Sequence, residues 1–408
     1  MKTATPATAR AINDRLVLDL LLERGPLTAP QLRELTGLSR PTVSDLIERL
    51  RDGGLIEVAG ECGENRRGPN ARLFGIVAGR AHVAGVDVRR TAVNVTVADI
   101  AGRTVGSAVR DFPWTGRGST PCFGGGAVPG GPSGPPGSSD PSVSPVSPVS
   151  SGTSGTSGSS GFSGTAGPDE AGAASASSGA DGTSGLAALI ESVVAEAAAG
   201  RALDAVVLGA PGLVDPRRGD LVAPNDVPGW EPGLLQTVRR GLGVPVTLEN
   251  EVNLAAVAEH RTGAATGRDD FVLLWLDEGV GAALVLDGRI RRGASGGAGE
   301  IGMLRTDGGF FCDLVGPDVL RDLDRDETAG RIAACAAALV TILDPGLVIL
   351  GGSIGREGGA GLAEPVAGRL RDLSPAPTEV RASTVAGNAV LQGAVLTALD
   401  LTRDRVFG

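Results

Sequence analysis

Residues 39–53 have the sequence Ser-Arg-Pro-Thr-Val-Ser-Asp-Leu-Ile-Glu-Arg-Leu-Arg-Asp-Gly, which predicts an amphipathic helix. The apolar residues recur at steps of three and four, so they share one face of the helix. The opening serine is suited to cap this helix and the closing glycine to end it. We therefore expect a helix that buries one face and presents Arg40, Thr42 and Ser44 on the other.

A shorter helix is expected just upstream, because residues 28–31, Thr-Ala-Pro-Gln, form a capping box. Gly37 supplies the turn between the two helices, and a further amphipathic helix precedes them. This is the spacing of a helix-turn-helix, although similar periodicity occurs in any three-helix bundle. The residues expected to point inward from the two upstream helices are Ile12, Leu16, Leu20, Leu32 and Leu35.

A wing follows in the expected place. Residues 55–59 and 72–76 are predicted strands around a polar tip at 60–69, which contains Arg66 and Arg67. We interpret residues 10–76 as a winged helix-turn-helix that binds double-stranded DNA. Arg40, Thr42 and Ser44 are expected to contact the major groove, and the two wing arginines to reach phosphates or the minor groove.

Composition limits the class of protein. The 408 residues suffice for two or three domains, and the net charge is −10. The first 75 residues are slightly more basic than acidic, so the negative charge belongs to the remainder. The four cysteines form no Cys-x-x-Cys pair, and no apolar run is long enough to span a bilayer. These features predict a cytoplasmic protein without a membrane segment.

Residues 115–185 differ from the rest of the chain. Glycine, serine, proline, threonine and alanine dominate, and few charges occur. Such a segment cannot bury enough apolar surface to offset its ordering entropy, so we predict a disordered insertion. An insertion of this length is tolerable because closure entropy grows slowly with loop length.

The flanks of the insertion predict one α/β domain, at 80–114 and 186–408. Residues 81–88, 91–99 and 104–111 are expected to form an antiparallel meander, followed by a helix at 186–199. A second half begins at Phe271. Two α/β halves around a cleft suit closure on a small ligand.

Six motifs then occur in an order that resembles the ROK family, which groups repressors, open reading frames and sugar kinases. The motifs are Gly85-Val86-Asp87-Val88-Arg89-Arg90-Thr91, Gly209-Ala210-Pro211-Gly212-Leu213-Val214-Asp215, Pro224-Asn225 with Gly229-Trp230, Glu249-Asn250-Glu251-Val252-Asn253, Gly299-Glu300-Ile301-Gly302, and Asp344-Pro345 with Val348-Ile349-Leu350-Gly351-Gly352. The resemblance implies a two-lobed actin-like ATPase fold behind the winged helix-turn-helix of the repressor branch.

Departures from the kinase motifs affect the phosphate loops. The Asp-x-Gly-Gly-Thr loop of the kinases, whose glycines let backbone amides approach phosphates, is replaced by residues 87–91 with Arg89 and Arg90. The second loop, normally Gly-Thr-Gly-Val-Gly, begins with Asp277 and Glu278, whose charge would repel phosphate. The catalytic aspartate of the kinases corresponds to Glu251, which is one methylene longer. We therefore expect no catalysis and no nucleotide cofactor.

The zinc site that the resemblance would imply is also incomplete. Family members that carry the metal have a histidine after Gly-Glu-Ile-Gly and a Cys-x-Cys-Gly cluster. This chain has Met303 at the histidine position, and only Cys312 in the cluster region. We therefore expect no metal site.

The sugar-binding positions are retained. By resemblance, a sugar would contact Asn250, Glu251 and Glu300, together with Asn225 and, beyond a gap, Asp313. Carboxylates and amides suit this role because they bond adjacent hydroxyl groups. An alternative remains open, since residues 249–251 also fit a strand end that caps a helix.

The sequence thus predicts a sugar-responsive transcriptional regulator, in particular a repressor, acting as a homodimer or dimer of dimers on a pseudo-palindromic operator. Two alternatives remain. One is an active ATP-dependent sugar kinase with a DNA-binding extension. The other is a DNA-binding protein whose second domain serves only for dimerisation.

Overall fold

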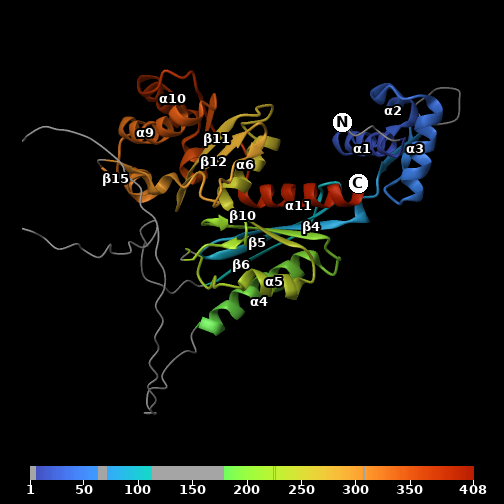
Figure 1. The fold of residues 1–408 in the computed structure, drawn as a ribbon, viewed down its shortest axis with the longest axis horizontal. Coiled ribbons are helices and arrows are strands. Elements are labelled where there is room, and N and C mark those ends of the chain that lie inside the picture. Colours follow the sequence, from blue (N-terminus) through green and yellow to red (C-terminus); the bar gives the residue numbers. More distant parts are fainter. Residues whose placement is uncertain (1–5, 63–70, 113–178, 224, 226, 307) are drawn as a thin grey trace, which may run out of the picture. The chain divides into compact units, whose positions relative to one another are not determined.

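The computed structural model describes residues 6–62, 71–112 and 179–408, apart from residues 224, 226 and 307 (Figure 1). They form an N-terminal module of three helices and a small sheet, followed by two lobes with a five-stranded sheet each. All described residues belong to one compact unit. Within the described ranges, no helix is both long and apolar enough to cross a membrane.

The N-terminal module has the predicted winged helix-turn-helix arrangement. Its elements are α1 (Pro6–Arg24), α2 (Ala29–Thr36), α3 (Arg40–Asp52), β1 (Leu27–Thr28), β2 (Ile56–Cys62) and β3 (Ala71–Ile76). The capping box is formed, because Thr28 and Gln31 exchange side-chain-to-backbone hydrogen bonds. Gly37 ends α2 with a φ of 68°, a left-handed conformation that glycine adopts without a steric penalty. The three strands are antiparallel in the order β1-β3-β2.

The inward face of α1 differs from the prediction. Ile12 is 61% exposed and Leu16 is 41% exposed, whereas the buried residues are Val17, Leu18 and Leu21; the third predicted residue, Leu20, is half-buried and packs against the core as expected. The prediction was wrong because this leucine-rich helix offers two adjacent apolar stripes, and periodicity alone does not select between them. On α2, Leu32 is fully buried as expected, but Leu35 is exposed.

The first lobe contains a mixed sheet in the order β10-β7-β4-β5-β6. The strands are β4 (His82–Val88), β5 (Ala92–Asp99), β6 (Thr104–Asp111), β7 (Ala205–Ala210) and β10 (Val246–Asn250). Strands β4, β5 and β6 form the predicted antiparallel meander, and β7 and β10 add to it in parallel. The helices α4 (Gly179–Ala198) and α5 (Leu234–Leu242) cover one face (Figure 1).

Helix α4 begins at Gly179, before the predicted start at residue 186. The predicted insertion therefore extends too far, since composition gives no sharp boundary between a glycine- and serine-rich segment and the helix after it. The remainder of the predicted insertion, 115–178, lies outside the described residues.

The second lobe contains a sheet in the order β13-β12-β11-β16-β17. The strands are β11 (Phe271–Leu276), β12 (Val280–Leu286), β13 (Arg289–Ile290), β16 (Leu347–Gly351) and β17 (Glu379–Ala382). The helices α9 (Arg325–Leu343) and α10 (Gly352–Leu373) pack on one face. Shorter elements complete the fold: η1 (Ala78–Arg80), β8 (Val214–Asp215), β9 (Asp220–Leu221), η2 (Ile301–Met303), β14 (Arg305–Thr306), β15 (Gly309–Phe310), α7 (Phe311–Val315) and α8 (Pro317–Leu320).

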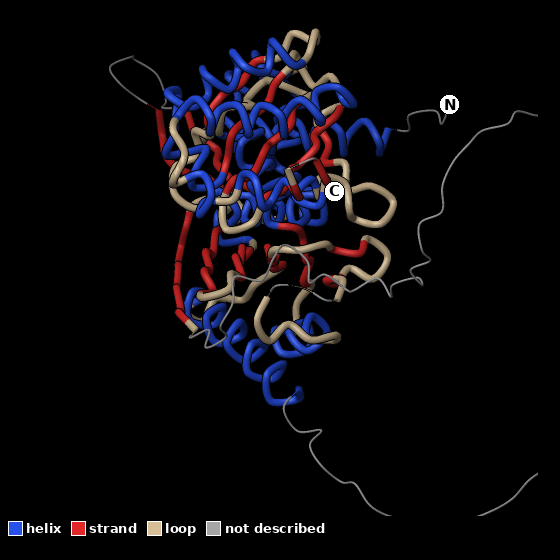
Figure 2. The backbone as a smooth tube through the Cα atoms, turned by 90° about the vertical axis from the view of Figure 1, so that its left-hand side faces the viewer, coloured by secondary structure: helices blue, strands red, loops and turns tan. Residues whose placement is uncertain are grey.

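Two helices, α6 (Glu251–Thr262) and α11 (Ala389–Phe407), share one hydrophobic core with both sheets. Strand β11 is apolar throughout because both of its faces are buried. Leu273 and Trp275 face this shared core, whereas Leu274 and Leu276 face α9 and α10. Figure 2 shows the resulting alternation of helices and strands. The carboxyl ends of β4, β7, β10 and β11 are thereby brought close to the N-terminus of α6.

Helix α11 also reaches the N-terminal module. Phe407 is buried in the same hydrophobic cluster as Val17 and Leu18 of α1. Arg15 of α1 donates to Asp404 at 2.9 Å, and its guanidinium lies over the Phe407 ring. One helix therefore contacts both the sheets of the lobes and the helix-turn-helix.

Candidate DNA-binding face and ligand pocket

Helix α3 presents the polar face that its sequence predicts. The side chain of Ser39 accepts the backbone N–H of Thr42, and the two hydroxyl groups are 2.8 Å apart. Arg40, Thr42 and Ser44 are exposed, and the opposite face is buried in the module core. Among the described residues, the side chains of Arg40 and Ser44 have no recorded partner. Arg66 and Arg67 lie outside the described residues, so the wing contacts stay a prediction.

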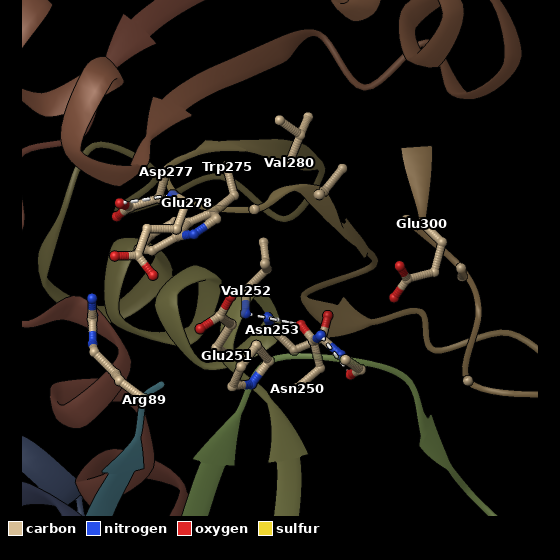
Figure 3. A pocket seen from close by; sticks show the side chains of 18 of the residues that line it. Arg89, Asn250, Glu251, Val252, Asn253, Trp275, Asp277, Glu278, Val280 and Glu300 are labelled. Carbon is tan, nitrogen blue, oxygen red and sulfur yellow. Dashed lines mark hydrogen bonds between the residues drawn. The ribbon is translucent and has the colours of Figure 1, made fainter. Parts of the chain in front are cut away.

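A pocket lies where the strand ends of both lobes meet (Figure 3). The residues that line it include Arg89 and Arg90 after β4, Gly212 after β7, Asn250 and Glu251 at the junction of β10 and α6, Asp277 and Glu278 after β11, and Gly296, Ala298, Gly299 and Glu300 before η2. The structure thus brings together Asn250, Glu251 and Glu300, which are far apart in sequence.

Asn250 uses most of its hydrogen-bonding capacity within the protein. Its Oδ1 accepts the backbone N–H groups of Val252 at 2.8 Å and Asn253 at 3.2 Å, capping α6, and its Nδ2 donates to the Gly212 carbonyl at 3.0 Å. The helix-capping alternative therefore holds for this residue. A side-chain amide has two N–H groups, so the same residue can still donate one hydrogen bond to a ligand.

Glu251 occupies the first turn of α6, beside Asn250. Burial, reinforced by the negative charge of Asp87, raises the pKa of its carboxyl from an ordinary 4.5 to about 8, while Arg89 acts in the opposite direction. At pH 7 this carboxyl is therefore mainly protonated. A protonated carboxyl both donates and accepts a hydrogen bond, which suits a sugar hydroxyl.

Glu300 lies on the far side of Asn250 from Arg89, with its carboxylate facing the pocket (Figure 3). Burial raises its pKa, and its side chain has no recorded hydrogen bond among the described residues. An unpaired, partly buried carboxyl favours a ligand that supplies the missing donors.

Two predicted sugar contacts are placed differently. Asn225 does not line the pocket; its side chain accepts the N–H of Val227 and donates to the Trp230 carbonyl, which stabilises the turn beside Gly212. Asp313 is exposed on α7 and also lies outside the pocket lining. Of the five predicted sugar contacts, only Asn250, Glu251 and Glu300 face the pocket in this structure.

The side of the pocket where the resemblance would place phosphates contains internal ion pairs. Arg89 Nε donates to Asp87 Oδ2 at 2.7 Å, and Asn388, which caps α11, donates to the same oxygen at 2.6 Å. Asp87 is fully buried, and its other carboxylate oxygen has no hydrogen-bond partner. The side chains of Glu251 and Asp277 are also close enough to interact electrostatically with Arg89.

Asp277 binds the N-terminus of α10. Its carboxylate accepts the backbone N–H of Ser353 at 3.2 Å and the Ser353 hydroxyl at 3.1 Å. The N-terminus of a helix is a site that attracts phosphate, because its N–H groups are unpaired and the helix dipole is positive there. In this chain a side-chain carboxylate already occupies that position.

The sequence reasoning did not single out Asn388 or Ser353 as parts of the site. Each follows the end of a strand or opens a helix, which is a general feature of residues near a pocket in an α/β fold. That feature alone could not indicate their partners, which lie 301 and 76 residues away in the chain.

In the described part of the chain, no group of three or more His, Cys, Asp and Glu side chains is placed to hold a metal ion. Met303 is partly exposed at the end of η2, and Cys312 is buried in α7. The thiol of Cys312 lies 3.8 Å from an oxygen of Asp313.

Comparison with known families agrees with this architecture. Residues 177–316 match the ROK family, and residues 12–68 match the MarR family. The chain carries a ROK domain. A winged helix-turn-helix precedes this ROK domain, so the predicted family and fold class are confirmed.

Both kinases and regulators occur among the relatives. The ROK-containing chain is 31% identical to a glucokinase of Streptomyces coelicolor, over 30% of this chain and 39% of the kinase. It is 32% identical to the xylose repressor of Bacillus subtilis, over 24% of this chain and 25% of the repressor. The matches thus span well under half the length of these relatives.

A solved structure similar over nearly the whole length is a ROK family transcriptional regulator described as a homologue of the Escherichia coli MLC protein. It covers 98% of this chain and 99% of its own, with a TM-score of 0.65 and 15% sequence identity. At this identity the likeness concerns the fold. It shows that the helix-turn-helix and the ROK domain occur together in one architecture.

Proposed function

We propose that this protein is a sugar-responsive DNA-binding transcriptional repressor of carbohydrate genes, with a non-catalytic kinase-like sensor domain. The proposal rests chiefly on one observation: Arg89 and Asp277, on the side of the pocket where phosphates would bind, are engaged by hydrogen bonds within the chain, whereas no hydrogen bond to the carboxyl of Glu251 or Glu300 occurs among the described residues. The regulators among the relatives support the same assignment.

Nucleotide binding would require these internal interactions to break. A triphosphate would have to displace Asp277 from the α10 N-terminus and separate Arg89 from the buried Asp87. Removing one partner of a buried charge pair is costly, because the remaining charge is left without compensation. A phosphoryl group would also approach Glu278, which has the same sign of charge.

The raised pKa of Glu251 bears on how it would meet a sugar. Burial raises the pKa of this carboxyl to about 8, so the protonated form predominates at pH 7. That form can both donate a hydrogen bond to a sugar hydroxyl and accept one from it.

Helix α11 supplies a connection between the pocket and the DNA-binding module. Asn388 at its N-terminus donates to Asp87, and Asp404 and Phe407 near its C-terminus contact Arg15 of α1. A sugar that changes the separation of the lobes would therefore change the position of α11 against α1. In a homodimer on a two-fold symmetric operator, that movement would alter the spacing of the two α3 helices.

A thermal-shift screen with matched assays tests this proposal. The purified protein is heated with D-glucose, D-xylose, N-acetyl-D-glucosamine or Mg·ATP, and ADP production is measured with each sugar. We expect at least one sugar to raise the melting temperature, because a ligand that binds the folded state stabilises it. Mg·ATP should have no such effect. Sugar-dependent ADP production would identify the kinase alternative instead.

A further inference from the structure

The loop at 291–299 joins β13 of the second lobe to Glu300, and it also contacts the first lobe. Its Arg292 Nε and Nη2 atoms donate to Glu249 Oε2 at 2.7 and 2.5 Å. Glu249 lies on β10 of the first lobe, directly before Asn250. The ion pair therefore connects the two lobes beside the pocket, although neither residue lines it.

The backbone of this loop packs closely against both lobes. A Cβ atom at Gly296 would lie 2.0 Å from the Val214 carbonyl oxygen of the first lobe, and one at Gly299 would lie 1.9 Å from the Ala282 carbonyl oxygen of the second. Both glycines also have positive φ values. The segment before Glu300 is thus held against both lobes.

Glu249 links this loop to the opposite wall of the pocket. Its carboxylate is nearly buried, with 7% of the residue exposed. The oxygen that does not contact Arg292 accepts the backbone N–H of Asn250 at 3.0 Å and the Asn253 side chain at 2.9 Å. One carboxylate therefore joins the loop of Glu300 to the backbone of Asn250 and to the first turn of α6, which carries Glu251.

We propose that Arg292 is a positioning residue: through Glu249 it fixes the distance between Glu300 and the Asn250–Glu251 wall, and so determines the affinity of the pocket for its sugar. The claim about sugar affinity rests on the proposed function, whereas the claim that Arg292 holds the loop in place does not. Charge-assisted hydrogen bonds from both nitrogens to one buried carboxylate restrict the loop more than a surface ion pair would. A ligand that bridges both walls then meets a pocket already in its bound geometry.

The chain offers a matched control. Arg291 is the neighbouring residue and also forms an ion pair, but the side chain of its partner Asp287 is 83% exposed, whereas that of Glu249 is nearly buried. Arg291→Gln therefore removes the same charge from the same loop without touching the connection between the lobes. Arg292→Lys retains the charge but not the paired geometry, so it should restore only part of the effect.

Two measurements on the full-length protein test the proposal: amide hydrogen exchange of residues 293–300 without sugar, and titration with the sugars of the thermal-shift screen. For Arg292→Gln we expect exchange about tenfold faster and sugar binding about tenfold weaker, a change of about 1.4 kcal/mol. Arg291→Gln should match the wild type in both. Equal exchange rates and equal affinities for the two variants would overturn the proposal.

A double variant separates positioning from loss of charge balance. Glu249→Gln/Arg292→Gln leaves no lone buried charge, so it should fold even if Arg292→Gln does not. It should still show faster exchange and weaker sugar binding, and wild-type values of both would contradict the proposal. If the wild type binds none of the sugars, the proposed sugar response is wrong, and the exchange measurement alone decides whether Arg292 holds the loop.

Discussion

The outer face of α3 and the side of the pocket where phosphates would bind differ in how their charged side chains are paired. Arg40 on α3 is exposed and has no recorded partner among the described residues. In the pocket, Arg89 is paired with Asp87, and Asp277 is bound to the α10 N-terminus. A face with unpaired polar side chains is available to an external partner such as DNA, whereas a site whose charges pair with one another excludes a charged ligand.

The largest effect should follow from removing the available face. A protein lacking residues 1–75 should lose specific DNA binding entirely, because α3 and the wing are absent. Within the full chain, Arg40→Ala should cost about 1–3 kcal/mol of binding to the preferred sequence and relax the preference at one base pair. Fluorescence anisotropy with a selected duplex measures both. Arg51→Ala, in the last turn of α3, serves as the control. Retention of specific binding by the truncated protein would refute the assignment.

The wing should contribute affinity without specificity. Arg66→Ala/Arg67→Ala is expected to weaken binding to all sequences, since contacts with phosphates carry no base information. The slope of log K against log salt concentration should become shallower by up to about two units, because two fewer counterions are released. A change in sequence preference with an unaltered salt slope would instead place these arginines at the bases.

A smaller effect is expected on the sugar side of the pocket. Glu300→Gln retains the shape of the side chain but removes an acceptor for which the chain supplies no partner. Sugar binding should weaken by about 1–3 kcal/mol, whereas DNA affinity without sugar should stay unchanged. Isothermal titration measures the first and anisotropy the second. Asp313→Asn, on the exposed part of α7, should change neither, and an equal loss of sugar affinity there would restore Asp313 as a contact.

Glu251→Gln should change sugar response least and pH dependence most. The sugar concentration that releases DNA should stay within about tenfold of the wild-type value, a difference of about 1.4 kcal/mol. Since folding raises the pKa of this carboxyl from 4.5 to about 8, the contribution of Glu251 to stability is fully present below pH 4.5 and is lost as the pH rises through 8. The melting temperature of the variant minus that of the wild type should therefore be larger at pH 8 than at pH 5. The increase in this difference should be at least about 3 °C, which corresponds to roughly 1 kcal/mol for a domain of this size. A difference that does not vary with pH would contradict the raised pKa.

The sequence predicted the helix-turn-helix better than the pocket. Capping of α2 and α3 and the burial of Leu32 depend on residues within a few positions of one another, and these predictions are confirmed. The face of α1 was misassigned, because the helix has two apolar stripes and the cluster that buries one of them includes residues distant in sequence, such as Phe407.

The pocket shows the limit more clearly. Resemblance placed Asn250, Glu251 and Glu300 near one another, because the motifs that carry them are associated with a known fold. The pairing of Asp87 with Asn388 and of Asp277 with Ser353 depends on which strand ends meet, and no periodicity in the sequence encodes that. Asn225 and Asp313 do not line the pocket: the side chain of Asn225 is bound to Val227 and Trp230, and Asp313 is exposed on α7.

The central claim is that the ROK domain senses a sugar and controls DNA binding without phosphoryl transfer. The most direct test measures both activities in one sample: the full-length protein, a duplex selected from a random pool, the sugar that raises its melting temperature, and Mg·ATP. We predict that the sugar changes DNA occupancy at least tenfold, that ATP does not alter this change, and that no ADP forms above the level without protein. Sugar-dependent ADP production that disappears in Glu251→Gln, with DNA occupancy unaffected by sugar, would contradict the account.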